Sequence, residues 1–229
     1  MTPYKKVGLF GGTFDPIHYG HLKAANDISA KLNLDHIYFI PAYIPPHKTD
    51  LGITSSHHRL EMVKRAIQGS LKFSVSEYEL NKKEISFSIE TIKHYKNLLP
   101  AETELYFIVG TDAFIGISTW KEVPEIFANC NMIVVSRPGY KLKPFDQIIK
   151  NPKLFKEFVI IKDGEEYKHY TGHSIYLFQL GSIDISSTEL RKRIAEGKSF
   201  ASYLPDTVID YIHTHSLYLK NRFRTDEGA

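Results

Sequence analysis

The residues best suited to chemistry lie near the start of the chain, in the string GGTFDPIHYGHL at residues 11–22. An apolar run precedes this string and apolar residues at helical spacing follow it, so the string is predicted to join a strand to a helix. The paired glycines Gly11 and Gly12 allow the backbone to approach a phosphate closely. The beginning of the following helix offers unpaired N–H groups and the positive end of a dipole. These features predict an anion-binding turn.

Two histidines of the string, His18 and His21, are three residues apart, with Gly20 between them. Both imidazoles can therefore face one anion, while Gly20 keeps the space between them open. This arrangement suits phosphoryl transfer, which relies on donors around the developing charge rather than on a protein nucleophile. For the histidine pair taken alone, two surface histidines beside a glycine turn are the simpler interpretation, and a metal site is another.

A second set of candidate phosphate ligands lies at the start of a later predicted helix, in the string ISSTELR at residues 185–191. The hydroxyls of Ser187 and Thr188, with the backbone N–H groups there, can bind the β- and γ-phosphates of a nucleotide. Arg191 can reach the same anion from the first turn of the helix. An ordinary helix cap at Ser186 explains the same spacing without a ligand, and the two interpretations are compatible.

Taken together, four strings of the chain resemble the signatures of one enzyme family. HYGH at residues 18–21 resembles the HxGH signature of the nucleotidyltransferase superfamily, and the longer string resembles the version found in nicotinate-nucleotide adenylyltransferases. PAYIPPHK at residues 41–48 resembles the PPHK loop of that family, and GTD at residues 110–112, followed by Trp120, resembles its GxD…W segment. ISSTELR resembles its ISSTxxR motif. The four motifs follow the family order and cover most of the chain.

The resemblance implies the transfer of AMP from ATP to nicotinate mononucleotide, with pyrophosphate as the second product, in NAD biosynthesis. It implies catalytic roles for His18, His21 and Arg191, which would stabilise charge on the transferring and leaving phosphates. The ATP site that it implies comprises Gly11, Gly12, Thr13, Phe14, Gly20, Gly110, Asp112, Ile185, Ser187 and Thr188. Mg²⁺ is expected to arrive on the ATP phosphates, and no metal site in the protein is predicted, because the sequence lacks a cluster of carboxylates.

The resemblance also implies a site for the pyridine nucleotide, formed by His47, Lys48, Ser88, Trp120, Lys121 and Arg137. Trp120 would stack on the pyridine ring, although a core tryptophan is the simpler interpretation without the resemblance. The string SFS at residues 86–88 replaces the usual Ser-Tyr-Thr of the family, whose third backbone N–H, with that after the tryptophan, binds the nicotinate carboxylate. Main-chain donors do not depend on the side chain, so Ser88 and Lys121 can still serve. For the basic residues Lys48 and Arg137, ordinary exposed loop positions are the alternative.

The elements that must position these residues alternate between apolar runs and helical patterns. Apolar runs predict strands at residues 7–10, 37–40, 73–75, 105–109, 132–135 and 175–178. Such alternation implies parallel pairing with right-handed crossovers, and therefore a doubly wound, Rossmann-like α/β sheet with its site at the carboxyl ends of the strands. The loops after Phe10, Ile40, Val109 and Val135 are expected to converge.

The C-terminal part of the chain changes character and predicts small helices, at about residues 186–219, packed beside the sheet. We expect a single domain over residues 1–219 and a disordered polar tail at residues 220–229. The stretch from residue 140 to 172 combines Lys, Glu and Pro with scattered aromatic residues and supports no assignment.

The composition is that of an ordinary globular protein, with 229 residues, of which 42% are hydrophobic and 24% charged. The net charge of +3 suits anionic small molecules and lacks the concentrated basic face of a nucleic-acid binder, so no nucleic-acid partner is expected. Cys130 is the only cysteine, and no apolar run approaches the ~20 residues of a membrane span. We therefore expect a cytoplasmic protein without membrane insertion, and a homo-oligomer is compatible with the sequence.

Two other functions compete with nicotinate-nucleotide adenylyl transfer. One is a related adenylyltransferase that prefers nicotinamide mononucleotide or accepts both nucleotides. The other is a non-catalytic module that binds nucleotides without turnover. The presence of both histidines and of Arg191 favours an enzyme, since a binding module has no need of donors aimed at a transition state.

Overall fold

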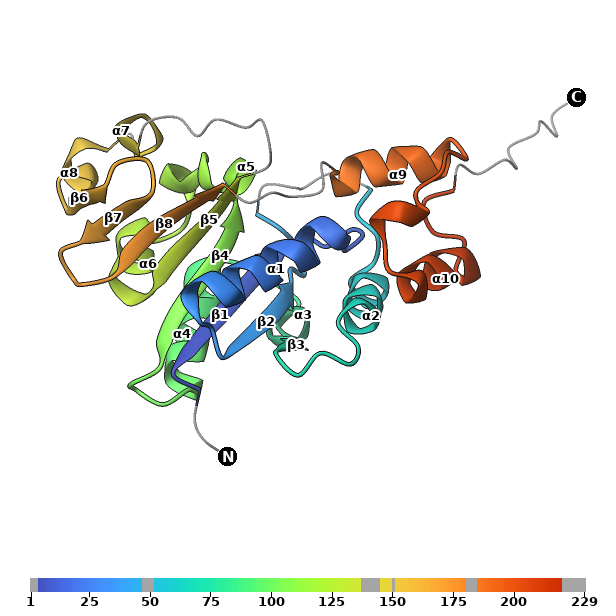
Figure 1. The fold of residues 1–229 in the computed structure, drawn as a ribbon, viewed down its shortest axis with the longest axis horizontal. Coiled ribbons are helices and arrows are strands. Elements are labelled where there is room, and N and C mark those ends of the chain that lie inside the picture. Colours follow the sequence, from blue (N-terminus) through green and yellow to red (C-terminus); the bar gives the residue numbers. More distant parts are fainter. Residues whose placement is uncertain (1–3, 47–51, 137–144, 150, 180–184, 220–229) are drawn as a thin grey trace, which may run out of the picture.

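The computed structural model describes residues 4–46, 52–136, 145–149, 151–179 and 185–219. Within these ranges eight strands form one sheet in the order β3-β2-β1-β4-β5-β8-β7-β6 (Figure 1). In chain order the strands are β1 (Lys6–Gly12), β2 (His36–Pro41), β3 (Phe73–Val75), β4 (Glu104–Gly110), β5 (Asn131–Ser136), β6 (Phe158–Lys162), β7 (Glu166–His169) and β8 (Ser174–Gln179). The six neighbouring strands β3, β2, β1, β4, β5 and β8 pair in parallel. At the β8 edge, β7 pairs antiparallel with both β8 and β6.

Helices connect the parallel strands and cover both faces of the sheet. The longer helices are α1 (Tyr19–Leu32), α2 (Ser56–Ala66), α4 (Ser88–Leu98), α6 (Val123–Asn129), α9 (Ser187–Ala195) and α10 (Asp206–Thr214). Shorter ones are α3 (Tyr78–Lys82), α5 (Thr111–Phe114), α7 (Phe145–Ile148), α8 (Pro152–Phe155) and the 3₁₀ helices η1 (Ile117–Thr119) and η2 (Ala201–Tyr203). In the described part of the chain, no helix is both long and apolar enough to span a membrane.

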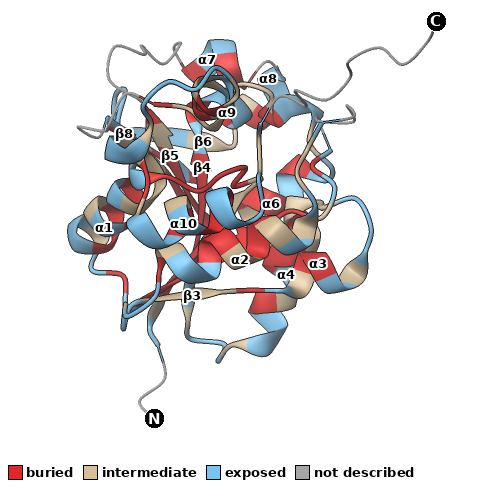
Figure 2. Cartoon of the chain, turned by 90° about the vertical axis from the view of Figure 1, so that its right-hand side faces the viewer, coloured by how far each residue is buried: buried red, intermediate tan, exposed pale blue. Residues whose placement is uncertain are grey.

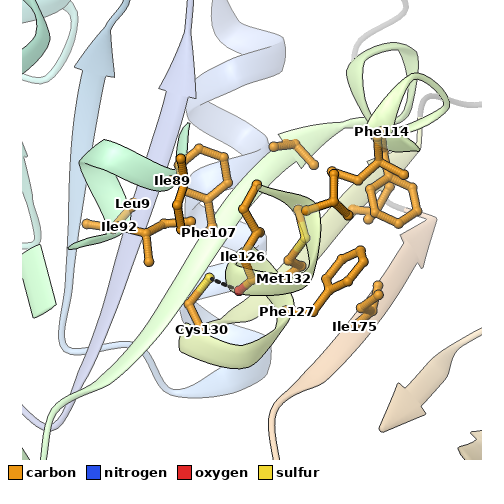
Figure 3. Close-up of a cluster of buried hydrophobic side chains, with 14 of the residues drawn as sticks. Leu9, Ile89, Ile92, Phe107, Phe114, Ile126, Phe127, Cys130, Met132 and Ile175 are labelled. Carbon is orange, nitrogen blue, oxygen red and sulfur yellow. Dashed lines mark hydrogen bonds between the residues drawn. The ribbon is translucent and has the colours of Figure 1, made fainter. Parts of the chain in front are cut away.

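Alternate residues of the central strands enter two separate hydrophobic cores. Leu9 of β1 belongs to the core beneath α4 and α6, which Figure 3 shows with Phe107, Ile92 and Ile126. The next residue, Phe10, belongs to the core on the other face, beneath α1, α2, α9 and α10. Buried residues accordingly concentrate on the strands and on the inner sides of the helices (Figure 2). Burial on both faces explains why these strands are continuous apolar runs in the sequence.

The predicted doubly wound α/β fold is confirmed, as are its six predicted strands and the C-terminal helices. The six predicted strands pair in parallel as expected, and β6 and β7 extend the sheet at one edge as an antiparallel hairpin within the stretch that supported no assignment. A signal for this hairpin was present: Asp163-Gly164 is a typical hairpin turn, and Gly164 adopts a φ of 72°. The predicted tail at residues 220–229 lies outside the described residues.

Candidate active site

A cavity of about 500 Å³ lies at the carboxyl ends of the central strands. Residues that end or follow β1, β2, β4 and β5 line it, so the carboxyl ends of these four strands converge as expected. Thr111 links two of these strand ends, because its hydroxyl donates to the carbonyl of Val135 at 3.0 Å. The cavity therefore occupies the place that parallel α/β sheets provide for ligands.

Most of the residues predicted from the motifs line this cavity. They are Gly11, Gly12, Thr13, Phe14, His18, Gly20, His21, Ser88, Gly110, Asp112, Trp120 and Ile185. Ser187, Thr188, Arg191 and Lys121 do not line it. Lys121 follows the lining residue Trp120, and Ser187 and Arg191 bond to the turn that joins β1 to α1. His47, Lys48 and Arg137 lie outside the described residues, so their predicted roles stay predictions.

The two histidines lie against each other at the start of α1. His18 is buried and is the residue before the first turn of the helix, and its ring centroid is 3.8 Å from that of His21. The backbone N–H of His18 donates to Nδ1 of His21 at 3.2 Å. Because Nδ1 accepts this bond, the proton of a neutral His21 ring resides on Nε2, which makes Nε2 a donor.

Gly12 is required by the close approach of a neighbouring ring. A Cβ at this position would lie 2.8 Å from the ring of Phe14, well inside contact distance. Phe14 itself adopts a φ of 50° and packs edge-on against His21, with 5.1 Å between the ring centroids. The glycine therefore makes room for the Phe14 ring, which contacts His21.

Side chains from distant elements hold the turn that joins β1 to α1 by its carbonyl groups. Arg59 of α2, which is 1% exposed, donates to the carbonyl of Thr13 at 2.8 Å. Arg191 of α9 donates to the carbonyl of Asp15 at 2.7 Å, and Ser187 donates to that of Pro16 at 2.9 Å. These bonds attach α2 and α9 to the turn, and they place Arg191 beside it.

The predicted cap of α9 is confirmed, because the hydroxyl of Ser186 accepts a bond from the N–H of Glu189 at 3.0 Å. Ser187 uses its own hydroxyl on the turn, so its side chain is engaged with protein in this structure. Nη2 of Arg191 donates to the hydroxyl of Thr188 at 3.4 Å, while about a third of the Arg191 side chain is exposed. The predicted capping and the predicted phosphate contacts are thus compatible.

Ser88 and Trp120 line the cavity from the face of the sheet that α4 and α6 cover. Ser88 is the first residue of α4, and Trp120 follows η1 and packs edge-on against Phe107. The indole N–H of Trp120 is buried and has no hydrogen-bond partner within the described ranges. Trp120 is therefore at once a partly buried residue against the core and a wall of the cavity, a position compatible with both predicted interpretations.

Lys121 is held on α4 by two contacts. Its Nζ lies 2.8 Å from Oε1 of Glu90 and 4.7 Å from the centre of the Phe87 ring. Hydrogen bonds from Lys121, and then from Lys82, lower the pKa of Glu90. The ammonium group of Lys121 is thus occupied by protein, which leaves the backbone N–H as the group of this residue available to a ligand.

Sequence reasoning missed Glu79, a buried acid in the cavity wall. Burial raises the pKa of Glu79, and hydrogen bonds from Thr91 and Ser86 to the charged form oppose this effect. Arg59 was also missed, although it lies four residues before Val63 on the apolar side of its helix. A charged residue at that helical spacing is a signal of a buried, paired side chain.

Comparisons with known proteins agree with this geometry. Residues 9–193 match the family described as cytidylyltransferase-like. Two curated relatives are named "probable nicotinate-nucleotide adenylyltransferase". The relative from Clostridium botulinum (strain Loch Maree / Type A3) is 41% identical over 92% of this chain and 97% of its own, and that from Desulfitobacterium hafniense is 40% identical over 95% and 97%.

Among solved structures, the Plasmodium falciparum nicotinic acid mononucleotide adenylyltransferase complexed with NaAD superposes with a TM-score of 0.70. It is 23% identical, and the match covers 93% of this chain and 97% of that one, so it shows the shared fold. The same enzyme complexed with APC gives a TM-score of 0.67. The family match, the two relatives and the site geometry lead to one conclusion: the chain belongs to the nicotinate-nucleotide adenylyltransferases, within the cytidylyltransferase-like family.

Proposed function

We propose that this protein transfers the AMP group of ATP to nicotinate mononucleotide, which yields nicotinate adenine dinucleotide and pyrophosphate in NAD biosynthesis. The observation that carries the proposal is the cavity itself, in which paired histidines at a helix start face the same space as Ser88 and Trp120. Relatives at 40–41% identity carry the name of this activity. The likeness to an enzyme complexed with NaAD supports the same reaction.

In the proposed reaction an oxygen of the mononucleotide phosphate attacks the α-phosphorus of ATP. The bond from the α-phosphorus to the bridging oxygen breaks, and pyrophosphate leaves with that electron pair. His18, Nε2 of His21 and Arg191 would stabilise the charge that develops on these oxygens. The turn at Thr13 and Phe14 would add backbone N–H donors. Positioning and charge stabilisation thus replace a covalent intermediate.

The remaining ATP contacts in this proposal come from the ends of the strands and from α9. Asp112, beyond the end of β4, would accept hydrogen bonds from the adenosine ribose. Ser187, Thr188 and Arg191 would hold the β- and γ-phosphates, and their position on the turn next to Asp15 supports this role. Gly110 and Ile185 would border the nucleoside.

The pyridine nucleotide would bind beside α4 and η1. Trp120 would stack on the pyridine ring, and the backbone N–H groups of Ser88 and Lys121 would donate to the carboxylate. The engaged side chain of Lys121 supports a main-chain role for this residue. His47, Lys48 and Arg137 remain proposed ligands of the mononucleotide phosphate.

Mg²⁺ is proposed to enter with ATP and, when bound, to neutralise charge on its phosphates. Within the described ranges no three His, Cys, Asp or Glu side chains are grouped so as to hold a metal ion. The cavity-lining acids Glu79 and Asp112 come from separate elements. This donor set fits a cation carried by phosphates and water rather than by a protein cage.

The test is a pyrophosphate-release assay on the purified chain with ATP. The acceptors compared are nicotinate mononucleotide, nicotinamide mononucleotide and pantetheine phosphate. Rapid release with nicotinate mononucleotide and slow release with the others is the expected result. Comparable release with nicotinamide mononucleotide would instead assign a dual-specificity enzyme. Binding of ATP and mononucleotide without any release would assign a non-catalytic module.

A further inference from the structure

The C-terminal segment reaches back to the turn that joins β1 to α1. The hydroxyl of Tyr218 donates to Oδ1 of Asp15 at 2.6 Å, although the two residues are 203 positions apart in the sequence. This segment follows α10, and α9 and α10 lie at the end of the molecule opposite to the β6–β7 hairpin (Figure 1). The last described residues of the chain therefore touch the string that carries the two histidines.

The backbone that delivers Tyr218 adopts a costly conformation. Ser216 and Tyr218 have φ values of 50° and 65°. These values lie in the left-handed region, which residues other than glycine and asparagine rarely adopt. Each such residue is strained and persists only when its surroundings hold it. The N–H of Leu217 donates to the carbonyl of Ile212, which anchors the bend between the two. The hydroxyl contact with Asp15 is thus maintained against backbone strain.

The carboxylate of Asp15 is buried and has a separate environment for each oxygen. The residue is 2% exposed. Oδ1 accepts from Tyr218, while Oδ2 accepts from the N–H of Thr54 at 3.2 Å and lies 3.9 Å from Nη1 of Arg191. Burial, and then the charge of Asp15, raise the pKa of Tyr218, so its hydroxyl retains its proton as the donor. The hydroxyl thus occupies one carboxylate oxygen, and Arg191 lies near the other.

Arg191 is attached to the same residue by a different group. Its Nη1 donates to the main-chain carbonyl of Asp15 at 2.7 Å, which is much shorter than its distance to the carboxylate. The guanidinium is thus oriented by a neutral carbonyl and leaves its other N–H groups to Thr188 and to a ligand. A close ion pair with a buried carboxylate would instead compete with the phosphates of a nucleotide.

We propose that Tyr218 is a positioning residue for adenylyl transfer, whose hydroxyl holds the Asp15 carboxylate in place and thereby keeps the Arg191 guanidinium available to the ATP phosphates. The inference rests on the proposed function, because that function assigns Arg191 to those phosphates. Without the hydroxyl, Oδ1 of Asp15 loses its donor in a buried place. The nearest cation that can compensate is Arg191, and the carboxylate then closes on it.

The experiment compares Tyr218→Phe with Tyr211→Phe, a matched control. Tyr211 lies on α10 and bonds through its hydroxyl to Nδ1 of His58 at 2.9 Å, away from the cavity. Both variants lose one tyrosine hydroxyl, and with it a hydrogen bond to another side chain, from the same C-terminal region. Pyrophosphate release is measured at fixed temperature below both melting transitions, with ATP and nicotinate mononucleotide varied separately.

Tyr218→Phe is expected to lower kcat about tenfold and to raise the KM for ATP. The reason is that the Asp15 carboxylate, without its donor, would draw Arg191 away from the ATP phosphates. Its KM for nicotinate mononucleotide and all constants of Tyr211→Phe should stay within about twofold of the unmutated values. Adding Asp15→Asn to Tyr218→Phe should restore part of the lost kcat, since a neutral amide does not capture the guanidinium. A purely structural tyrosine predicts no such recovery.

Each other outcome overturns the proposal. Kinetic constants of Tyr218→Phe that match those of Tyr211→Phe, or a double variant no better than Tyr218→Phe, would assign the hydroxyl to stability alone. A Tyr218→Phe chain that does not fold would do the same. An unmutated chain that releases no pyrophosphate overturns the proposed function and this inference with it, whereas an active unmutated chain whose Tyr218→Phe variant keeps normal constants shows that only the inference has failed.

Discussion

The central parallel strands and the β6–β7 hairpin both contain apolar runs, but their surroundings differ. Leu9 and Ile108, in the central parallel strands, are 0% exposed because helices cover both faces. In the antiparallel hairpin, three consecutive apolar residues of β6, from Val159 to Ile161, are 54–64% exposed. None of the described residues that line the cavity comes from β6 or β7. An apolar run therefore marks a strand in both parts, but only the covered strands form a rigid support for chemistry.

The covered strands also explain why the site forms at their ends. Parallel strands end at the same edge, so residues separated by more than a hundred positions, such as Thr13 and Trp120, meet without any long-range sequence signal. None of the described residues that flank the two hairpin strands lines the cavity. Four predictions test this contrast between the supported site and the exposed edge.

The largest effect is expected at the histidine pair. His18→Ala and His21→Ala should each lower kcat by about 10²–10³, or on the order of 3–4 kcal/mol, while ATP binding changes far less, because a preorganised donor acts mainly on charge in the transition state. His213→Ala, at an exposed position of α10, is the matched control and should be neutral. Steady-state kinetics and ATP titration check this. Near-normal kcat in either site variant would remove that histidine from the mechanism.

The second prediction concerns stability in the two parts of the sheet. Leu9→Ala should lower the free energy of unfolding by about 2–5 kcal/mol, since it leaves a cavity in a packed core. Ile160→Ala in β6, where the side chain is 54% exposed, should change it by no more than about 0.5 kcal/mol. Urea unfolding of both variants measures the difference. Equal losses would show that the hairpin is as well supported as the centre.

These two parts also show what the sequence could predict. The central strands and the cavity residues were predictable because burial on both faces leaves an apolar run, and because each motif, such as residues 11–22, is local in the chain. The hairpin was missed because the apolar run of β6 is mostly exposed and shows no alternation, while the buried positions of β7 are Tyr167 and His169 rather than aliphatic residues. The contact of Tyr218 with Asp15 could not be predicted, since a single sequence carries no sign of a bond across 203 positions.

The third prediction concerns the choice between acid and amide, which depends on main-chain donors at the supported edge. Nicotinate mononucleotide should exceed nicotinamide mononucleotide by at least about tenfold in kcat/KM, because an amide NH₂ would face a donor and leave it unpaired at a cost of roughly 1–3 kcal/mol. Comparing kcat/KM for the two substrates checks this. Equal values in the unmutated enzyme would refute the pocket.

Two variants at one position sharpen this test. Ser88→Thr should keep the preference, because it retains the backbone N–H. Ser88→Pro should erode it, because it deletes that N–H, and the fold should tolerate it: Ser88 is the first residue of α4, where proline is favoured. A Ser88→Pro enzyme with unchanged preference would move the carboxylate contact elsewhere.

The smallest effect is expected at Glu79, in the cavity wall. Burial raises the pKa of Glu79 above its usual value of 4.5, so the folded chain holds this proton more tightly than the unfolded chain. The stability that this group contributes is therefore fully present below pH 4.5 and is lost as the pH rises through the raised pKa. The effect is small because hydrogen bonds from Thr91 and Ser86 favour the charged form.

Glu79→Gln removes the titration, so the free energy of unfolding of this variant should decline less with rising pH than that of the unmutated chain. Denaturant unfolding at a series of pH values measures this, with Glu102→Gln at an exposed position as the control. Parallel profiles for Glu79→Gln and the unmutated chain would show that the cavity wall is as well solvated as the exposed edge.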